Sequence, residues 1–304
     1  MARSWEDGDN LADRALYSLI KMIGLLVRRI SRKHSTSLAY WIGDFVYTIL
    51  KTRRQLVEKN LALTFPEKTQ AEIDSIARQI YRNQAENMIE VLRLPMIKTA
   101  EDAALLLDID ARTIFAKTID QKKGGVLVSA HFGNWELLAF CSGLLTRPVT
   151  IVVKPLKNHA IDKQINAWRT MRGNRIVYDW KALREGLRTL KSGGLLTLLG
   201  DQSDNGGSFF TEFLGRRTTV FLGPAYLALK AGVPLFVATC HRSDGGRYRV
   251  EIEEIDSTGL GTSKTDAEEL ARRYTKAIER YIYRYPEEWL WLHNRWKRTE
   301  TLSS

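Results

Sequence analysis

The chain has 304 residues, of which 46 are Lys or Arg and 35 are Asp or Glu, giving a formal net charge of +11. This length is enough for a substantial hydrophobic core in one large domain or two small ones. So basic a chain is expected to meet an anionic partner, such as lipid headgroups, nucleic acid, phosphorylated ligands or an acidic protein. The two cysteines, Cys141 and Cys240, are too far apart in sequence for a metal or redox motif, so we expect inert core thiols.

Two apolar runs open the chain, and the first, residues 15–30, contains Lys21. Its basic end consists of Arg28, Arg29, Arg32 and Lys33. Because a membrane-spanning helix needs about 20 apolar residues, we interpret this run as an interfacial helix that favours anionic headgroups. The second run, residues 38–50, is rich in aromatic side chains but contains Asp44. The alternative is a pair of ordinary amphipathic helices with solvated charges, and no cleavable signal peptide is expected.

A helical pattern continues from residue 51 to residue 94, with breaks at Pro66 and Pro95. Thr69 and Glu72 have the spacing of a capping box, which predicts that a helix begins directly after Thr69. The apolar residues of this helix recur at helical spacing, so we expect one buried face and a supporting role without catalysis.

After residue 99 the chain alternates between strand-like and helical runs. Strands are predicted at residues 105–109, 126–130, 149–153, 175–178, 195–199, 235–239 and 248–255. Helices are predicted at residues 161–171, 181–190, 225–231 and 265–285. The alternation predicts an α/β fold in which a largely parallel mixed sheet is flanked by helices. We expect residues 1–60 to form a helical, membrane-associated region and residues 61–304 the α/β domain, with 248–255 as a half-exposed edge strand.

One predicted strand leads directly into a pair of titratable residues. Residues 126–130 end at His131, Gly133 allows a tight turn, and Asn134 is a candidate N-cap that places Glu136 in the first helical turn. A neutral imidazole at the mouth of a sheet can accept a proton from a substrate hydroxyl. A carboxylate five residues later can orient the imidazole and stabilise the imidazolium that forms. The pattern therefore indicates a base and its orienting acid.

The surroundings of this pair narrow the chemistry. The sequence has no Gly-x-Ser-x-Gly nucleophile elbow and no cysteine beside the pair, which favours direct attack by an activated acceptor hydroxyl over a covalent enzyme intermediate. Backbone donors at the helix start after Gly133 are candidates for an oxyanion hole. The alternative is a structural buried histidine with Glu136 as an ordinary helix-start residue, which is commoner for an isolated His-x4-Glu match.

Further candidate site residues follow other predicted strands. Asp201 and Gln202 come after residues 195–199, and because carboxyl ends of parallel strands share one edge, we expect Asp201 to face the same crevice as His131. The alternative for Asp201 is a turn cap. Arg169 and Lys154 can hold an anionic substrate, although both could belong to solvated surfaces.

Aromatic residues provide two more candidates. Phe213 belongs to an apolar cluster beside the Gly206–Gly207 loop, and it either lines a lipid channel or is part of the core, the commoner fate of aromatic residues. Arg295 follows a Trp-rich stretch, a combination typical of a membrane-surface edge or a nucleic-acid platform.

The sequence His131-Phe-Gly-Asn-Trp-Glu136 after a strand resembles the His-x4-Asp/Glu box of the glycerolipid and lysophospholipid acyltransferase superfamily. Within that superfamily it is most similar to the late acyltransferases of lipid A, the lauroyl and myristoyl transferases. Further matching blocks follow in order between residues 38 and 297. They are Val153-Lys154-Pro155 with Asn158 and Arg169, Gly200-Asp201-Gln202 with Phe213-Leu214-Gly215, Gly223-Pro224-Ala225 with Pro234, and Trp291 to Lys297. Lys154-Pro155 departs from the Arg-Pro usual in the family.

The resemblance implies an acyltransferase at the cytoplasmic face of the bacterial inner membrane that moves a fatty acyl group from a thioester to a hydroxyl of a lipid A precursor, in lipopolysaccharide biosynthesis. Acyl carrier protein is the implied donor, with coenzyme A as the alternative. His131 would be the base and Glu136 its orienting acid. The implied substrate-binding residues are Lys154, Arg169, Asp201, Gln202, Phe213 and Arg295.

Neither a cofactor nor a metal ion is expected, because none of the five histidines has the spacing of a zinc motif. Two other functions stay open. The same box would serve the acylation of another membrane lipid, such as a lysophospholipid or a phosphatidylinositol mannoside. A non-enzymatic basic protein could bind nucleic acid or scaffold a membrane complex, although the sequence has no RNA-recognition, helix-turn-helix or zinc pattern, so we expect no nucleic-acid partner.

Overall fold

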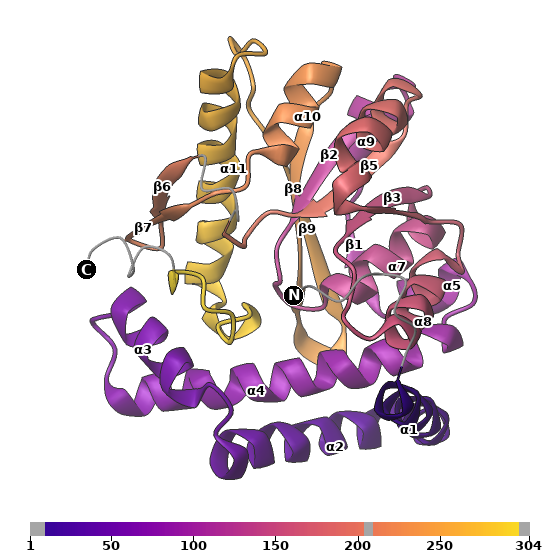
Figure 1. Ribbon diagram of the computed structural model, residues 1–304, viewed down its shortest axis with the longest axis vertical. Helices are drawn as coiled ribbons and strands as arrows, with labels where there is room; N and C mark the ends of the chain where they lie inside the picture. Colours follow the sequence, from indigo (N-terminus) through magenta and orange to yellow (C-terminus); the bar gives the residue numbers. More distant parts are fainter. Residues whose placement is uncertain (1–9, 204–208, 298–304) are drawn as a thin grey trace.

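The computed structural model describes residues 10–203 and 209–297 and contains a seven-stranded sheet with helices on both faces (Figure 1). The sheet order is β1-β9-β8-β2-β5-β3-β4. Its strands are β1 (Leu107–Ile109), β2 (Gly125–Ser129), β3 (Val149–Val153), β4 (Arg175–Tyr178), β5 (Leu195–Leu199), β8 (Leu235–Arg242) and β9 (Tyr248–Ile255). Every neighbouring pair is parallel except β8 and β9, which confirms the predicted α/β class and the largely parallel mixed sheet.

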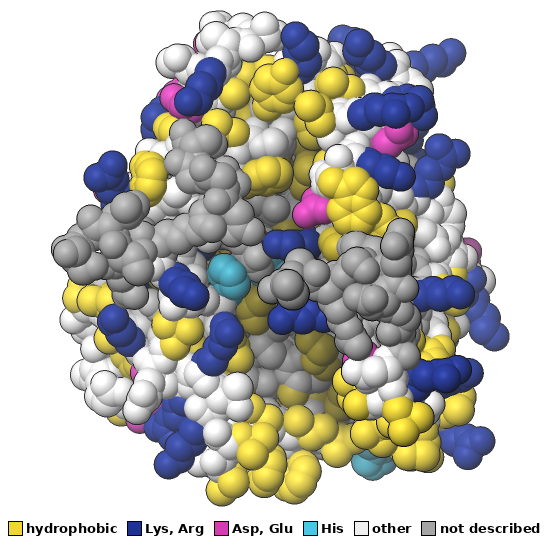
Figure 2. Space-filling view, in the orientation of Figure 1, with side chains coloured by type: hydrophobic (Ala, Val, Ile, Leu, Met, Phe, Trp, Pro, Cys, Tyr) yellow, Lys and Arg dark blue, Asp and Glu magenta, His cyan; other side chains and the backbone are white. Residues whose placement is uncertain are grey.

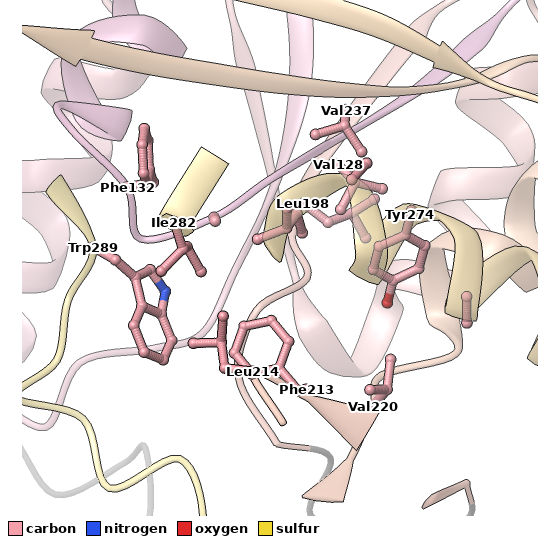
Figure 3. Close-up of a cluster of buried hydrophobic side chains, with 14 of the residues drawn as sticks. Val128, Phe132, Leu198, Phe213, Leu214, Val220, Val237, Tyr274, Ile282 and Trp289 are labelled. Carbon is pink, nitrogen blue, oxygen red and sulfur yellow. The ribbon is translucent and has the colours of Figure 1, made fainter. Parts of the chain in front are cut away.

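The two faces of the sheet are covered by different helices, because alternate side chains of each strand point to opposite faces. On one face lie α7 (Trp135–Leu145) and α8 (His159–Thr170). On the other lie α9 (Ala182–Lys191), α10 (Gly223–Ala231) and α11 (Lys264–Arg284). Figure 3 shows the core beneath this second group, where Val128 and Leu198 of the sheet lie near Tyr274 of α11.

Short helical segments connect these elements. They are η2 (Leu94–Met96), α5 (Ala100–Ala104), α6 (Arg112–Ile114), η3 (Phe115–Ile119), η4 (Asp179–Lys181), η5 (Asp244–Gly246) and η6 (Pro286–Glu288). The predicted strand at residues 105–109 begins two residues late, because α5 and its C-cap at Leu105 precede it.

The sheet differs from the prediction at two other places. Strand β9 is half-exposed as expected, but it is not an edge strand. It lies between β8, with which it pairs antiparallel, and β1, with which it pairs in parallel. Strands β6 (Phe210–Phe213) and β7 (Arg216–Thr219) form a separate antiparallel hairpin that was not predicted. Neither strand has the apolar run by which the strands of the main sheet were predicted, because β6 reads Phe-Thr-Glu-Phe and β7 reads Arg-Arg-Thr-Thr.

An N-terminal helical layer lies along one end of the sheet, at the bottom of Figure 1. It consists of α1 (Leu11–Val27), α2 (Arg32–Phe45), η1 (Val46–Leu50), α3 (Arg54–Thr64) and α4 (Gln70–Arg93). The capping box at Thr69 and Glu72 begins α4 as predicted. Within the described residues 10–203 and 209–297, no helix combines the length and apolar character needed to cross a bilayer.

Helices α3 and α4 belong to the same hydrophobic cluster as the sheet. Val57 and Leu61 of α3 and Ile80 of α4 are fully buried with Val126 and Val128 of β2. The proposed boundary near residue 60 stays a prediction, and it falls inside a helix that packs on the shared core.

The contact between α2 and α4 explains the polar residue in the second apolar run. Asp44 faces α4 and accepts hydrogen bonds of 2.7–2.8 Å from both Arg78 and Arg82. The hydrogen bonds from Arg82, and next those from Arg78, hold the pKa of the Asp44 carboxyl well below its usual range. Next to it, Gly43 brings the helices together, since a Cβ there would lie 2.6 Å from the Cα of Arg82. Asp44 is therefore an interhelical contact, although its side chain keeps 26% of its surface exposed.

We predict that Gly43→Ala lowers the free energy of unfolding by about 1–3 kcal/mol, because backbone atoms of α4 cannot yield to the new methyl group. The matched control is Gly24→Ala in α1, where the added Cβ would make ordinary contacts of 3.5 Å or more. Removing a glycine from a helix interior should make that variant neutral or up to about 1 kcal/mol more stable. Urea unfolding followed by circular dichroism measures both, and equal stabilities would contradict the close α2–α4 contact.

Candidate active site

His131 lies on a tight turn between β2 and α7. Asn134 caps α7, as predicted, by accepting a hydrogen bond of 3.0 Å from the backbone N–H of Leu137. Gly133 has a φ of +57°, and a Cβ there would lie 1.4 Å from the carbonyl oxygen of Cys240. Only glycine fits this position, because both the left-handed backbone and the approach of β8 exclude a side chain.

Three hydrogen bonds from two distant segments hold the turn in place. The backbone N–H of Leu290 donates to the carbonyl of His131 at 2.9 Å, and the backbone N–H of Gly133 donates to the carbonyl of Glu288 at 2.9 Å. The Nδ2 of Asn87, a buried residue of α4, donates to the carbonyl of Gly133 at 2.7 Å. Helix α4 was expected to have only a supporting role, and through this contact its support reaches the turn itself.

The hydrogen-bond partner of His131 is Asp201. The distance from His131 Nδ1 to Asp201 Oδ1 is 2.9 Å, and the other carboxylate oxygen accepts a hydrogen bond of 2.8 Å from Trp289 Nε1. The side chain of Asp201 is 2% exposed, while that of His131 is 19% exposed. Gln202 places Nε2 at 3.3 Å from His131 Nε2. A carboxylate on Nδ1 leaves Nε2 as the nitrogen that can accept a proton from a bound substrate.

The electrostatics of the pair favour the charged form of both groups. For Asp201, burial opposes the charge, but the attraction of His131 and the hydrogen bonds from His131 and Trp289 lower the pKa to about 2. Burial likewise acts against protonation of His131, but the charge and hydrogen bond of Asp201, with a smaller effect of Glu136, raise its pKa above the usual value. Asp201 is therefore ionised at neutral pH and stabilises an imidazolium on His131.

Glu136 has a different partner from the one expected. The sequence suggested that Glu136 would orient His131, but its carboxylate accepts two hydrogen bonds from Arg169, of 2.9 Å and 2.5 Å. Arg169 also donates to the side chain of Asn166. Among the described residues, the carboxylate that contacts the His131 ring is that of Asp201. The reason is geometric: Glu136 reaches α8, whereas Asp201 arrives beside His131 from the adjacent strand β5.

A cavity of about 490 Å³ lies beside His131 and extends along the sheet face covered by α7. The face drawn in Figure 2 is hollowed near its centre. Apolar lining residues include Leu127 of β2, Ala139 of α7, Ile151 of β3 and Leu195 of β5. The cavity volume is typical of a site for a small molecule, and an apolar interior with a few polar groups at one end suits an amphipathic ligand.

Apart from Asp201, which pairs with His131, the predicted substrate-binding residues separate into two groups. Lys154, Arg169 and Gln202 line the cavity near His131. Phe213 and Arg295 do not line it and are 1% exposed each. Figure 3 shows Phe213 among buried side chains, and Arg295 donates to Thr218 at 2.7 Å with its guanidinium 5.1 Å from the Phe213 ring.

The candidate oxyanion donors after Gly133 are partly occupied. The backbone N–H of Gly133 donates to a carbonyl of η6, and that of Asn134 donates to the carbonyl of Cys240 at 3.1 Å. The N–H groups of Trp135 and Glu136 open α7, positions that have no acceptor within a helix. The side-chain amide of Gln202, which the sequence suggested only as a substrate contact, is a further donor on the cavity side of His131.

The chain was compared with known proteins. A profile of the bacterial lipid A biosynthesis acyltransferase family matches residues 11–298. Similar proteins include the lipid A biosynthesis palmitoleoyltransferase of Escherichia coli K12, 25% identical over 84% of this chain and 82% of its own, and the lauroyltransferase of the same organism, 26% identical over 84% and 83%. A phosphatidylinositol mannoside acyltransferase of Mycolicibacterium smegmatis is 26% identical over 73% of each chain. The chain therefore belongs to the bacterial lipid A biosynthesis acyltransferase family.

Proposed function

We propose that this protein is a membrane-associated acyltransferase that moves a fatty acyl group from a thioester donor to a hydroxyl of a lipid A precursor. The observation that carries the proposal is the His131–Asp201 pair at the polar end of a long apolar cavity. The apolar part suits a fatty acyl chain, and the imidazole is positioned to act on the carbonyl end. Family membership supports the reaction class.

In the proposed mechanism, His131 Nε2 accepts the proton of the acceptor hydroxyl as its oxygen attacks the thioester carbonyl. Asp201 keeps the proton on Nδ1 and stabilises the imidazolium. The amide of Gln202, with the first N–H groups of α7, donates to the oxyanion of the tetrahedral intermediate. The carbon–sulfur bond then breaks, the thiolate leaves, and the imidazolium returns its proton to the sulfur, so that an ester and a free thiol are formed.

Glu136 and Arg169 form the wall of the cavity beside this reaction. We propose that the pair holds α7 against α8 near the bound carbonyl, and that the charge of Glu136 adds to that of Asp201 at His131. Lys154, exposed at the cavity mouth, is a candidate contact for a phosphate of donor or acceptor. Acyl carrier protein is the proposed donor, with coenzyme A as the alternative.

The second candidate for the acceptor is a lipid of another class. The similarity to a phosphatidylinositol mannoside acyltransferase favours that class as the second candidate, because identity to it is about the same as to the lipid A enzymes. Both acceptors are phosphorylated glycolipids of a membrane, so the same cavity and base would serve either. The proposed site of action is the cytoplasmic face of the bacterial inner membrane.

We propose that the N-terminal helical layer binds the membrane surface. Apolar side chains of α1, α2 and η1 that are 40–65% exposed include Leu19, Met22, Leu26, Trp41, Phe45 and Ile49. Exposed basic side chains on α1, on α2 and in the turn between them include Arg14, Lys21, Arg29 and Lys33. Figure 2 shows apolar side chains gathered along its lower edge, over the N-terminal layer. Apolar and basic groups together are typical of a segment that lies in an anionic interface.

We predict that His131→Ala and Asp201→Asn each reduce kcat by about 10²–10⁴, because one removes the base and the other removes its orienting charge. Glu136→Gln should have the smaller effect, since it contacts Arg169. His34→Ala, in an exposed residue of α2, is the matched control and should leave turnover unchanged. Transfer of acyl groups to a lipid A precursor, followed by mass spectrometry on folded variants, measures the effect. Wild-type turnover in folded His131→Ala would rule out this base.

The rate should also report the raised pKa of His131. Since the base must be neutral to accept a proton, kcat/KM should rise with pH and level off above an inflection higher than the usual histidine value of about 6.5. Asp201→Asn removes the largest charge that raises this pKa, so in the residual activity the inflection should move to lower pH. An inflection that stays in place in Asp201→Asn would contradict the assigned pair.

The membrane proposal predicts that the protein sediments with vesicles containing phosphatidylglycerol and is partly released by high salt, because attractions between exposed charges are screened within about 10 Å at 0.1 M. Replacing Leu19, Met22 and Leu26 together by Ser should weaken binding at least tenfold. Tyr283→Ser, at a 48% exposed residue of α11, is the control and should bind as the wild type does. Equal sedimentation of all three proteins would contradict the assignment of this surface.

A further inference from the structure

The cavity follows helix α7 along its whole length. Trp135, Ala139, Ser142 and Thr146 all line the cavity, and their spacing places them on one stripe of the helix. The stripe begins at the base, since the Trp135 ring lies edge-on to that of His131 with centroids 5.2 Å apart. It ends at Thr146, the C-cap residue of α7. The helix therefore provides a scale that is measured from the reacting centre.

The sheet strands that face α7 across the cavity also show that the cavity runs away from His131. Val149 and Leu195 line the cavity and are register partners at the amino ends of β3 and β5. His131 and Gln202 lie beyond the carboxyl ends of β2 and β5. The cavity thus crosses the full height of the sheet, from the carboxyl edge that carries the chemistry to the amino edge, where Ile114 also lines it.

Small side chains of α7 provide the space. Ala139 has only a methyl group, and the hydroxyls of Ser142 and Thr146 donate to backbone carbonyls one turn earlier, those of Leu138 and Ser142. Because each hydroxyl is satisfied by its own helix, these residues present a mainly apolar surface to the cavity. A larger aliphatic residue at either position would fill the cavity without leaving a polar group unpaired.

Helix α7 and strand β3, on opposite sides of the cavity, give similar estimates of its length. From Trp135 to Thr146 the helix rises about 16 Å at 1.5 Å per residue. The four residue steps of β3 extend about 13 Å at 3.3 Å per step. An extended hydrocarbon chain advances about 1.25 Å per carbon, from a C–C bond of about 1.5 Å and an angle of about 111°. The cavity therefore accommodates about ten to thirteen extended carbons beyond the carbonyl.

We propose that Ser142, Thr146 and Val149 set the length of the transferred acyl chain, at about twelve carbons, by closing the cavity at the end distant from His131. The proposal rests on the proposed function, because it assigns the apolar cavity to the acyl group of the donor. It adds a prediction that the reaction class does not make: each position along α7 corresponds to a chain length.

A second group of lining residues, which we call the second branch, gives an alternative placement for an acyl chain. Val152, Leu198 and Ala182 line it near the carboxyl edge, and Val152 and Leu198 pack in the core of the opposite sheet face, the face that α9 covers. An acyl chain bound there would be insensitive to the stripe on α7. The two placements are separated by adding volume to one branch at a time.

The experiment measures kcat/KM for a series of saturated coenzyme A thioesters of graded even chain length. Thr146→Leu should reduce transfer of the longest accepted chains at least tenfold and leave shorter chains unchanged. Ser142→Leu lies four residues closer to His131, about 6 Å, so its limit should fall by about a further five carbons. Val149→Ala enlarges the distant end and should shift the preferred length upward, which a merely destabilised variant would not do.

Two control variants test whether added volume changes the chain-length profile only when it is placed on α7. Ala167→Leu adds the same volume on the exposed surface of α8 and should leave the profile unchanged. Ala182→Leu fills the other branch and should also leave it unchanged. A shift caused by Ala182→Leu and not by Ser142→Leu, or a uniform loss at every chain length in Ser142→Leu and Thr146→Leu, would overturn the proposal.

A second readout does not need catalysis. Isothermal titration with free fatty acids of the same lengths should show the same graded limits in the same variants. If the wild-type protein transfers no acyl group from any thioester, the proposed function fails. The titration still tests whether Ser142, Thr146 and Val149 limit the length of the bound chain. If transfer occurs but neither the transfer profile nor the binding profile responds to the α7 variants, these residues do not set the chain length, and the proposed function stands.

Discussion

The structure of the site depends on a buried carboxylate, that of Asp201. An ion with 2% of its side chain exposed would be costly to bury without partners, and it has two, His131 Nδ1 and Trp289 Nε1. These partners come from the turn after β2 and from the segment after α11, while Asp201 itself follows β5. The charge is therefore stable only when all three segments are in place, and the same charge makes His131 the proton acceptor at Nε2.

The turn that carries His131 is held by parts of the chain that lie far from it in sequence. Asn87 holds the carbonyl of Gly133, and Asn134 Nδ2 donates to Glu90 of α4. Glu90 also accepts hydrogen bonds from Arg32 of α2 and from the Tyr248 hydroxyl, so it links the exposed N-terminal layer to the site. The layer is thus a structural part of the active site in addition to being the proposed membrane surface.

Local pattern was enough to predict most of the fold and the position of the base. Apolar runs predicted all seven strands of the main sheet, four with the observed bounds and three with ends that differ by one to three residues, because buried parallel strands read as short apolar segments. The pattern also led to His131, Gly133 and Asn134, whose roles are defined within one turn. It missed the β6–β7 hairpin, whose strands contain mostly polar residues and have no apolar run.

Pairings across the sheet could not be read from spacing. Glu136 is five residues from His131 and was the expected partner, but the direction of its side chain is set by Arg169 on another helix. Asp201 was expected in the same crevice from topology alone, whereas its hydrogen bond to His131 Nδ1 was not. Phe213 and Arg295 carry residue types suited to binding, and their burial beneath the site depends on tertiary packing.

The most direct test of the central claim is mass spectrometry of lipid A from cells in which the gene for this protein has been deleted and then restored. Restoring the wild-type gene should add the mass of one fatty acyl group per lipid A molecule, and restoring the Asp201→Asn variant at equal protein level should not. Lipid A of unchanged mass in all three strains would contradict a role in lipid A acylation. Full acylation by the Asp201→Asn variant would contradict the assignment of Asp201 as the partner of the base.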